Sequence, residues 1–457
     1  MRNTVKRARI LYALIALFFI GLGILMYSFV IHGDEWASNR VNNHVYKYRQ
    51  LANAGTVYDT NGEILAETQE GERVYNESRL VREAVLHAVG DTEGFIADGV
   101  QNAYRSELLG YNFVDGVYDS VMKGKGNDIT LTLDANVCAT ALDWLDGQRG
   151  TVGVYNYKTG EIVCMVSSPT FDPENKPDDM SSDWYEGVYI NRFTSGVFTP
   201  GSIFKVVTGI CAIENIPDIF KRTFTCDGAS KIGSGEVICN SVHGKVTFEQ
   251  ALNRSCNSAF SVIADELGKE KLTATVRALG LGKNISFGRI TTYRSTFDIS
   301  KSSALDIGWA GIGQYTTLVN PCQMMVLMGA IANGGTAVNP YLVKDSSVLG
   351  SVLEKEKGKL CSNITLSKET ANKMKKLLRS NVENYYYDKF RSELKMCGKT
   401  GTAEVDGKRP HAWFVGFSQR KDLPYAIVVM VENGGGGSSV AIPIANKVMK
   451  VIAGYTD

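Results

Sequence analysis

The hydrophobic positions form one long block near the start of the chain and many short blocks after it. Residues 10–31 are uncharged and almost wholly apolar, and residues 1–9 carry four basic residues and no acidic one. At ~1.5 Å per residue, a helix of that length spans a hydrocarbon core of ~30 Å. A cleaved signal peptide is the alternative, but the run is longer than its apolar core and no small-x-small site follows. We therefore expect a cytoplasmic tail, a transmembrane helix over 10–31, and everything from Trp36 outside.

The short blocks after the anchor predict two regions. Residues 32–127 are polar, with two strand-like pieces around an Asn61-Gly62 turn, and we interpret them as a membrane-proximal pedestal domain. From residue 128, strand-like runs precede a helical middle, further strand-like runs follow it, and a last helix is expected over 443–453. This order predicts an α/β (α+β) domain over 128–457 whose sheet uses both ends of the segment. The strand-like runs are 128–133, 151–157, 161–166, 412–417 and 425–431.

A candidate nucleophile lies in the segment Thr199-Pro-Gly-Ser-Ile-Phe-Lys205. A turn at Pro200-Gly201 and an apolar run after it predict a helix that begins near Ser202. Residues three apart share one helix face, so the Lys205 amine could take the Ser202 hydroxyl proton. A serine that merely begins a helix is the alternative. The same spacing recurs at Ser120/Lys123, Ser392/Lys395 and Ser418/Lys421, so spacing alone does not decide.

The order of motifs along the chain favours Ser202. Ser255-Cys256-Asn257 is the only S-x-N in the sequence, and Lys399-Thr400-Gly401 follows it. A serine–lysine pair, S-x-N and K-T-G in this order form the set shared by penicillin-binding proteins and β-lactamases. A second K-T-G at residues 158–160 lies between two strand-like runs and is predicted to be a hairpin turn.

Composition argues against several other classes of protein. The net charge is +1 with mixed signs, so nothing indicates nucleic acid. Five scattered histidines show no metal-ligand spacing and no phosphate loop follows a strand, so we expect no metal and no cofactor.

Nine cysteines leave at least one unpaired, and a disulfide between Cys226 and Cys239 is an open alternative. Five others in apolar contexts are predicted to be small core residues, namely Cys138, Cys164, Cys211, Cys256 and Cys322.

The order of motifs resembles that of a class B penicillin-binding protein, and the resemblance covers roughly residues 128–457. It includes the hairpin over 151–172, Asn191-Arg192, Gly311-Ile-Gly-Gln314 and Lys399-Thr-Gly-Thr-Ala-Glu404. It implies the serine β-lactamase and D,D-peptidase fold, an antiparallel sheet flanked by helices. Two residues depart from the family pattern. Cys256 in the S-x-N motif is expected to pack inward, and Tyr315 is expected to narrow one end of the cleft.

The resemblance also implies residue roles. Ser202 would be the acylated nucleophile and Lys205 its base, with Lys399 as a second cation that lowers the pKa of Lys205. Ser255 would shuttle the proton to the leaving amine, and Asn257 would hold the acyl part of the substrate. Thr400, Gly401 and Thr402 would bind the terminal carboxylate, and the backbone N–H groups of Ser202 and Thr402 would form the oxyanion hole. A four-glycine run at 434–437 is a loop for which a gating role is one interpretation.

The implied activity is D,D-transpeptidation of peptidoglycan stem peptides that end in D-Ala-D-Ala, with acylation by β-lactam antibiotics. The segment between the anchor and residue 128 is too short for the glycosyltransferase domain of the bifunctional class. We therefore expect a polytopic membrane glycan polymerase as partner. A β-lactamase, a β-lactam sensor and a non-catalytic wall-assembly scaffold are the alternatives.

Overall fold

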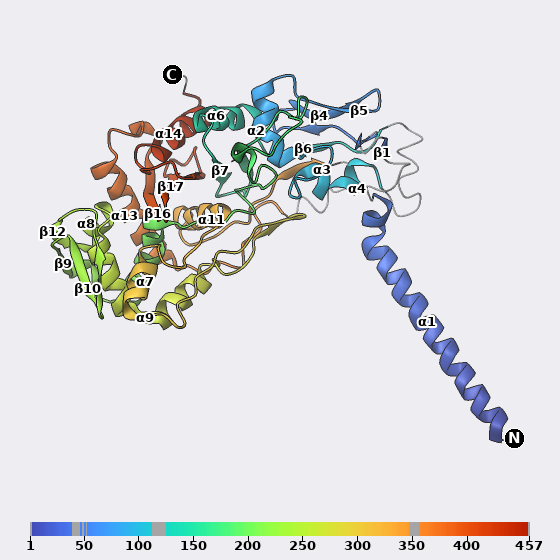
Figure 1. Cartoon of the computed structure of the whole chain (residues 1–457), viewed down its shortest axis with the longest axis horizontal. Helices are drawn as coiled ribbons and strands as arrows, with labels where there is room; N and C mark the ends of the chain where they lie inside the picture. Colours follow the sequence, from blue (N-terminus) through green and yellow to red (C-terminus); the bar gives the residue numbers. More distant parts are fainter. Residues whose placement is uncertain are drawn as a thin grey trace.

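The N-terminal block forms one long helix that extends away from the rest of the molecule. The computed structural model describes residues 2–38, 46–47, 50–51, 53–111, 125–346 and 356–455. Helix α1 (Arg2–Ala37) projects from one end (Figure 1), and its apolar side chains are exposed along its length. Among the described residues it is the one helix long and apolar enough to cross a membrane. A lipid core would cover this surface, which matches a single-pass membrane anchor.

A five-stranded sheet adjoins the anchor and combines strands from distant parts of the chain. Its order is β15-β6-β3-β4-β5, and β3 and β6 are parallel. The strand expected at 128–133 therefore joins this sheet instead of the catalytic one. Its strands are β3 (Val57–Tyr58), β4 (Ile64–Gln69), β5 (Glu72–Tyr75), β6 (Ile129–Leu131) and β15 (Val343–Ser346). Nearby lie β1 (Tyr46–Lys47), β2 (Gln50–Leu51), α2 (Arg79–Val89), α3 (Val100–Ala103) and α4 (Arg105–Leu108).

The central sheet of the larger domain uses both ends of its segment, as the sequence predicts. Its order is β16-β17-β18-β7-β8, and every neighbouring pair is antiparallel. Residues 158–160 form the β7–β8 turn, which confirms the predicted hairpin. The strands are β7 (Gly150–Asn156), β8 (Ile162–Ser168), β16 (Met396–Val405), β17 (Lys408–Ser418) and β18 (Tyr425–Val431).

Helices cover both faces of this sheet. Helices α6 (Ala135–Leu145) and α14 (Ala441–Ile452) pack on one face, and α11 (Pro321–Ala332) packs on the other (Figure 1). Residues 426–431 of β18 are consequently all buried, which explains why that strand reads as one continuous apolar run. Helix α13 (Lys368–Tyr385) packs on β16.

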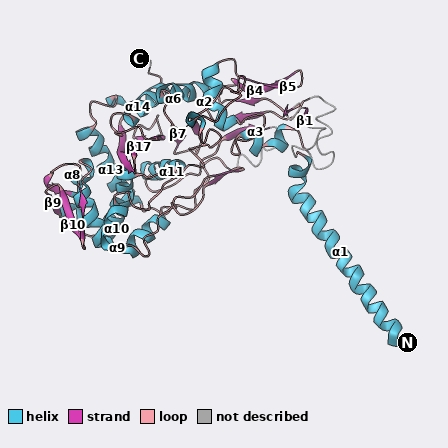
Figure 2. Ribbon diagram, in the orientation of Figure 1, coloured by secondary structure: helices cyan, strands magenta, loops and turns pink. Residues whose placement is uncertain are grey.

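A helical lobe lies beside β16 (Figure 1), and Figure 2 labels its helices α8, α9 and α10. It contains the 3₁₀ helix η2 (Gly201–Phe204) and the helices α7 (Lys205–Asn215), α8 (Phe248–Asn253), α9 (Asn257–Ala278) and α10 (Ala304–Gly311). Between α7 and α8 come two antiparallel pairs, β9 (Thr223–Cys226) with β12 (Gly244–Thr247) and β10 (Ala229–Ile232) with β11 (Gly235–Ile238). Short remaining elements are η1 (Asp183–Tyr185), η3 (Ile219–Lys221), β13 (Ser286–Phe287), β14 (Ile290–Thr291) and η4 (Ser392–Leu394).

Candidate active site

Ser202 and Lys205 face each other at the start of the helical lobe. Ser202 lies in η2 and Lys205 is the first residue of α7, and the Lys205 Nζ lies 3.0 Å from the Ser202 Oγ. Residues three apart in a tight helical turn stack on one face, so the local sequence produces this contact. Gly201 has φ 54°, and a Cβ there would lie 2.8 Å from the Thr402 carbonyl oxygen. Glycine therefore lets the turn that carries Ser202 pack closely on β16.

The surroundings of Lys205 favour its neutral form. The side chain is fully buried, and burial, helped by the nearby Lys399 cation, holds the pKa of Lys205 well below its usual value. Two oxygens accept N–H groups from its Nζ, the Ser255 carbonyl at 2.6 Å and the Asn257 Oδ1 at 2.7 Å. A neutral amine has two N–H groups and one lone pair. Because these two oxygens take the N–H groups, the lone pair is available to the Ser202 hydroxyl.

Ser255 connects the two buried lysines. Lys399, on β16, donates to the Ser255 Oγ at 3.0 Å and to the Thr400 carbonyl at 3.1 Å. The same Oγ lies 3.2 Å from the Lys205 Nζ, and burial lowers the pKa of Lys399 to about 7. Ser255 has φ 54°, a left-handed conformation that costs a non-glycine residue ~1–3 kcal/mol. The surrounding structure stabilises this conformation, which places the hydroxyl between the two amines.

The K-T-G strand forms the opposite wall of the site. Thr400 and Thr402 line the same cavity as Ser202, and Gly401 lies between them on β16. The Thr400 hydroxyl is hydrogen-bonded to the Tyr386 hydroxyl at 2.6 Å. The sequence interpretation did not include Tyr386, which lies just beyond the end of α13 and has no motif around it.

An open cavity of about 870 Å³ contains the predicted residues. Ser202, Ser255, Asn257, Thr400 and Thr402 line it together, with Gln314 and Glu404 among the other lining residues. The structure thus brings the three motifs to one place. Tyr315 is half exposed and is not among the lining residues, although its neighbour Gln314 is, so the narrowing expected from this side chain stays a prediction.

The other serine–lysine pairs lie elsewhere. Ser392 is exposed in η4, and Ser418 at the end of β17 is buried and donates to the Leu394 carbonyl. The Ser120/Lys123 pair lies outside the described residues. Among the described pairs, Ser202/Lys205 is the one at the cavity.

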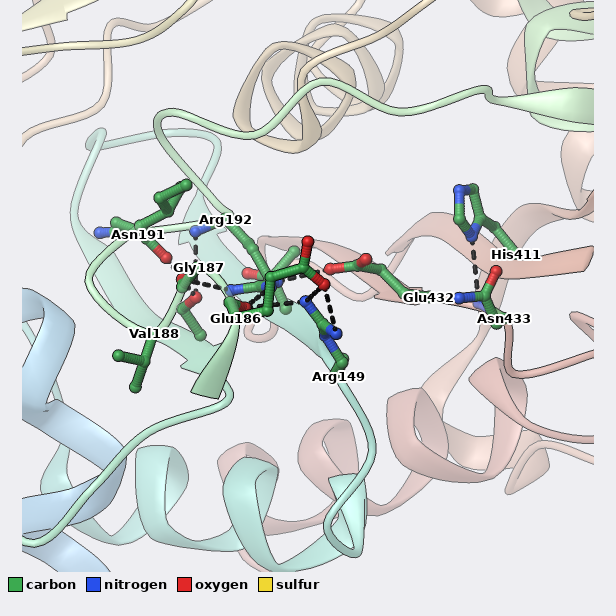
Figure 3. A network of polar contacts seen from close by, with 12 residues as sticks. Arg149, Glu186, Gly187, Val188, Asn191, Arg192, His411, Glu432 and Asn433 are labelled. Atoms are coloured by element: carbon green, nitrogen blue, oxygen red, sulfur yellow. Dashed lines mark hydrogen bonds and ion pairs between the residues drawn. The ribbon is translucent and has the colours of Figure 1, made fainter. Parts of the chain in front are cut away.

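A polar network secures the end of β18, from which the four-glycine run begins (Figure 3). The Arg192 guanidinium is almost fully buried and pairs with Glu432 at 2.5 Å. The next residue, Asn433, donates its backbone N–H to the His411 Nδ1 at 3.1 Å. At the far end of the run, the Gly437 N–H donates to the Thr402 Oγ1 at 3.4 Å. The run therefore borders the K-T-G strand, while its gating role stays a prediction.

All nine cysteines lie in the described part of the chain, and all nine are free and buried or nearly so. The disulfide considered between Cys226 and Cys239 therefore does not form in this structure. The five cysteines predicted to be small core residues are fully buried: Cys138, Cys164, Cys211, Cys256 and Cys322. Cys256 packs inward, as expected.

The fold and the site define a serine acyltransferase with a buried lysine beside the nucleophile. The model of the penicillin binding protein transpeptidase domain matches residues 150–450, and the chain belongs to this family. It is 27% identical over 446 residues to stage V sporulation protein D of Bacillus subtilis, covering 84% of this chain and 68% of the relative. It is 26% identical over 396 residues to the peptidoglycan D,D-transpeptidase PbpA of Mycolicibacterium smegmatis, covering 76% of each.

Solved structures show the same fold. Penicillin-binding protein A of Mycobacterium tuberculosis, in its penicillin G acyl-enzyme complex, matches with a TM-score of 0.72 at 23% identity, covering 88% of this chain and 99% of that one. The D,D-transpeptidase domain of a peptidoglycan glycosyltransferase from Eggerthella lenta matches with a TM-score of 0.70 at 26% identity, covering 88% and 98%. The expected antiparallel sheet flanked by helices is confirmed.

Proposed function

We propose that the chain is a membrane-anchored serine D,D-transpeptidase that cross-links peptidoglycan stem peptides through an acyl-enzyme on Ser202. The observation that carries this proposal is the 3.0 Å contact between the Ser202 Oγ and the buried amine of Lys205. An amine that is neutral at ordinary pH is able to remove the serine proton, and a protonated one is not. Family membership and relatives named peptidoglycan D,D-transpeptidase support the same activity.

The first half-reaction forms the acyl-enzyme. Lys205 removes the hydroxyl proton of Ser202, and the Oγ attacks the carbonyl carbon of the penultimate D-alanine. The backbone N–H groups of Ser202 and Thr402 stabilise the oxyanion. The proton passes from Lys205 through Ser255 to the leaving amine, and the terminal D-alanine departs. The Ser255 Oγ is within 3.2 Å of the Lys205 Nζ, so the transfer needs little movement.

The second half-reaction transfers the acyl group to an amine of a neighbouring stem peptide, and Ser202 regains its proton. In both steps Asn257 holds the acyl part of the substrate. Thr400, Gly401 and Thr402 receive the terminal carboxylate, which the threonine hydroxyl groups would bind. A β-lactam would acylate Ser202 by the same attack, and its opened ring would stay attached.

The proposed topology places residues 1–9 in the cytoplasm, the membrane span at 10–31, the pedestal at 32–127 and the catalytic domain at 128–457. Two strands of that last segment, β6 and β15, pair in the pedestal sheet. The basic flank before the apolar run supports this orientation. A polytopic membrane glycan polymerase is the proposed partner, since it would supply the strands to be cross-linked. A reporter fused after Asp457 should be active only in an extracytoplasmic form, and cytoplasmic activity would overturn the orientation.

Fluorescent penicillin labelling of the full-length protein in detergent tests the proposed activity. The wild type should be labelled in a 1:1 ratio, and Ser202→Ala should not be labelled. Ser392→Ala, which alters the exposed serine of a pair with the same spacing, should be labelled like the wild type. Labelling of Ser202→Ala would show that the nucleophile is another residue. A folded wild-type protein that is never labelled would favour the non-catalytic scaffold.

A further inference from the structure

Four potential metal ligands meet beside the active site. The three sulfurs of Cys226, Cys239 and Cys256 and the imidazole of His243 lie so that their ligand atoms are all within 4.8 Å of one another. Cys226 and Cys256 are fully buried, Cys239 is nearly so, and His243 is half-buried. Cys239 and His243 also line the cavity that contains Ser202. None of the catalytic steps above uses these four side chains.

The separations within this cluster have the dimensions of a tetrahedral zinc site. An ion with Zn–S of ~2.3 Å and Zn–N of ~2.0–2.1 Å holds its sulfurs ~3.8 Å apart and sulfur from nitrogen ~3.6 Å apart. The Sγ atoms of Cys239 and Cys256 are 3.9 Å apart. The Nδ1 of His243 is 3.5 Å from the sulfur of Cys226 and 3.5 Å from that of Cys239. A disulfide would need ~2.05 Å between sulfurs, so these distances do not describe one.

We infer that Cys226, Cys239, His243 and Cys256 bind one Zn²⁺ ion, which holds the S-x-N motif in its catalytic position. Three thiolates and one imidazole are a donor set that selects zinc. All four positions around the ion are taken by protein atoms, so the site is closed and positions residues instead of activating water. The expectation of no metal, which considered the spacing of histidines alone, missed this set. Three of its four ligands are cysteines, spread over thirty-one residues of sequence from Cys226 to Cys256.

The local fold gives a physical reason for an ion here. Cys226 ends β9, Cys239 follows β11 and His243 precedes β12. These strands have four residues each and pair only in two-stranded sheets. Isolated two-stranded hairpins are marginally stable in water, and a structural metal is a common way to stabilise a small unit. One ion bound at the strand ends would connect both strand pairs to α9.

Backbone N–H groups already point at the sulfurs. The Asn257 N–H donates to the Cys239 Sγ at 3.2 Å, and the Ala259 N–H donates to the Cys256 Sγ at 3.4 Å. Cys256 is also the N-cap of α9, where the helix dipole favours a negatively charged thiolate. Thiolates are the form that binds metal, and such outer hydrogen bonds orient metal ligands.

The cluster connects directly to the catalytic residues. Cys256 is the middle residue of the S-x-N motif, between Ser255 and Asn257. Ser255 is held in a strained left-handed conformation, and the Asn257 N–H donates to the Cys239 sulfur. An ion bound to Cys239 and Cys256 would therefore fix the backbone that directs Ser255 and Asn257 toward Lys205. The departure of Cys256 from the family pattern is thereby explained.

Metal content gives the first test, and it does not depend on activity. The full-length protein, purified in detergent without chelators, should contain one zinc ion per chain when its metal content is measured by inductively coupled plasma mass spectrometry. After the zinc is removed by a chelator, added Co²⁺ should give the intense thiolate-to-cobalt absorption of a tetrahedral sulfur-rich site. Cys226→Ala and His243→Ala should lose both signals, and Cys322→Ala, which alters a buried cysteine elsewhere, should keep both. No bound zinc in the wild type, or equal zinc in all variants, would overturn the inference.

Acylation gives the second test, and its interpretation rests on the proposed function. Removal of zinc should slow fluorescent-penicillin acylation by ~10²-fold, the effect expected when catalytic groups shift by ~1 Å. Re-addition of Zn²⁺ should restore the rate, and His243→Cys, which keeps four ligands, should retain both zinc and labelling. Zinc binding without labelling of the loaded wild type would refute the proposed function but not the site. A Cys239–Cys256 disulfide, found as a 2 Da mass loss in protein purified without oxidant, would overturn the metal site.

Discussion

The substitution Asn257→Asp tests whether Lys205 acts as a neutral base. In the wild type, the Asn257 Oδ1 accepts an N–H group from the Lys205 Nζ at 2.7 Å without adding charge. An aspartate has nearly the same shape but would place a carboxylate at that distance. At an effective dielectric constant of ~20, a pair of unit charges 2.7 Å apart attracts by ~6 kcal/mol, or ~4 pKa units. Because the buried carboxylate must itself ionise, we expect a smaller rise in the pKa of Lys205, at least ~2 units.

The sign of the effect follows from which form of Lys205 reacts. Burial and the Lys399 cation lower the pKa of Lys205, so the wild type keeps the reactive neutral amine to a lower pH than an exposed lysine would. In Asn257→Asp the amine would stay protonated to higher pH. The midpoint of the acylation rate against pH should therefore move up by ~2 units or more. At a pH below both midpoints, the variant should be slower by ~10²-fold or more.

Stopped-flow acylation by a fluorescent penicillin across the pH range measures this midpoint. Asn257→Ala is the matched control, because it removes the same hydrogen-bond acceptor without adding a charge. Lys399 faces the site in all three proteins and contributes equally to each. The control should be slower than the wild type, with its midpoint not raised. If Asn257→Asp has the midpoint of the wild type, Lys205 is not the titrating base and our reasoning fails.

Three further predictions concern the base, the acyl-enzyme and the stability of the fold. In Lys205→Arg the arginine keeps the positive charge but cannot lose its proton near neutral pH, so the rate of acylation should fall by ~10²-fold or more. A rate within a few-fold of the wild-type rate would show that another group is the base. After brief exposure to penicillin, intact-protein mass spectrometry should find the adduct on Ser202 for many minutes, and its loss within seconds would favour a β-lactamase. Glu432→Gln removes the carboxylate charge that pairs with the buried Arg192 and should lower the free energy of unfolding by about 3 kcal/mol in denaturant titration. Asp422→Asn, in an exposed pair, should change it by less than ~1 kcal/mol; equal effects would contradict the role of burial.

The sequence by itself determined the features that depend on neighbouring residues. The uncharged run over 10–31 is a helix because every turn is apolar. The Lys158-Thr-Gly segment is a hairpin turn because two strand-like runs flank it and its glycine, at φ 92°, permits the turn. The contact between Ser202 and Lys205 follows from a spacing of three within one helical turn. The order of the three motifs then identified the class of enzyme.

The tertiary structure decided which distant residues meet. The same spacing of three at Ser392 and Ser418 does not bring those serines to the cavity that contains Ser202. Ser202 reaches it because η2 packs on β16 and leads into α7, which packs on α9. Strand β6 pairs with the pedestal sheet instead of the central sheet. The alternation of its side chains predicts a strand but does not say which sheet the strand joins. The meeting of Cys226, Cys239, His243 and Cys256 depends likewise on how two short strand pairs fold onto α9. Local pattern sets dihedral angles over a few residues, whereas contacts between distant segments depend on the packing of whole elements.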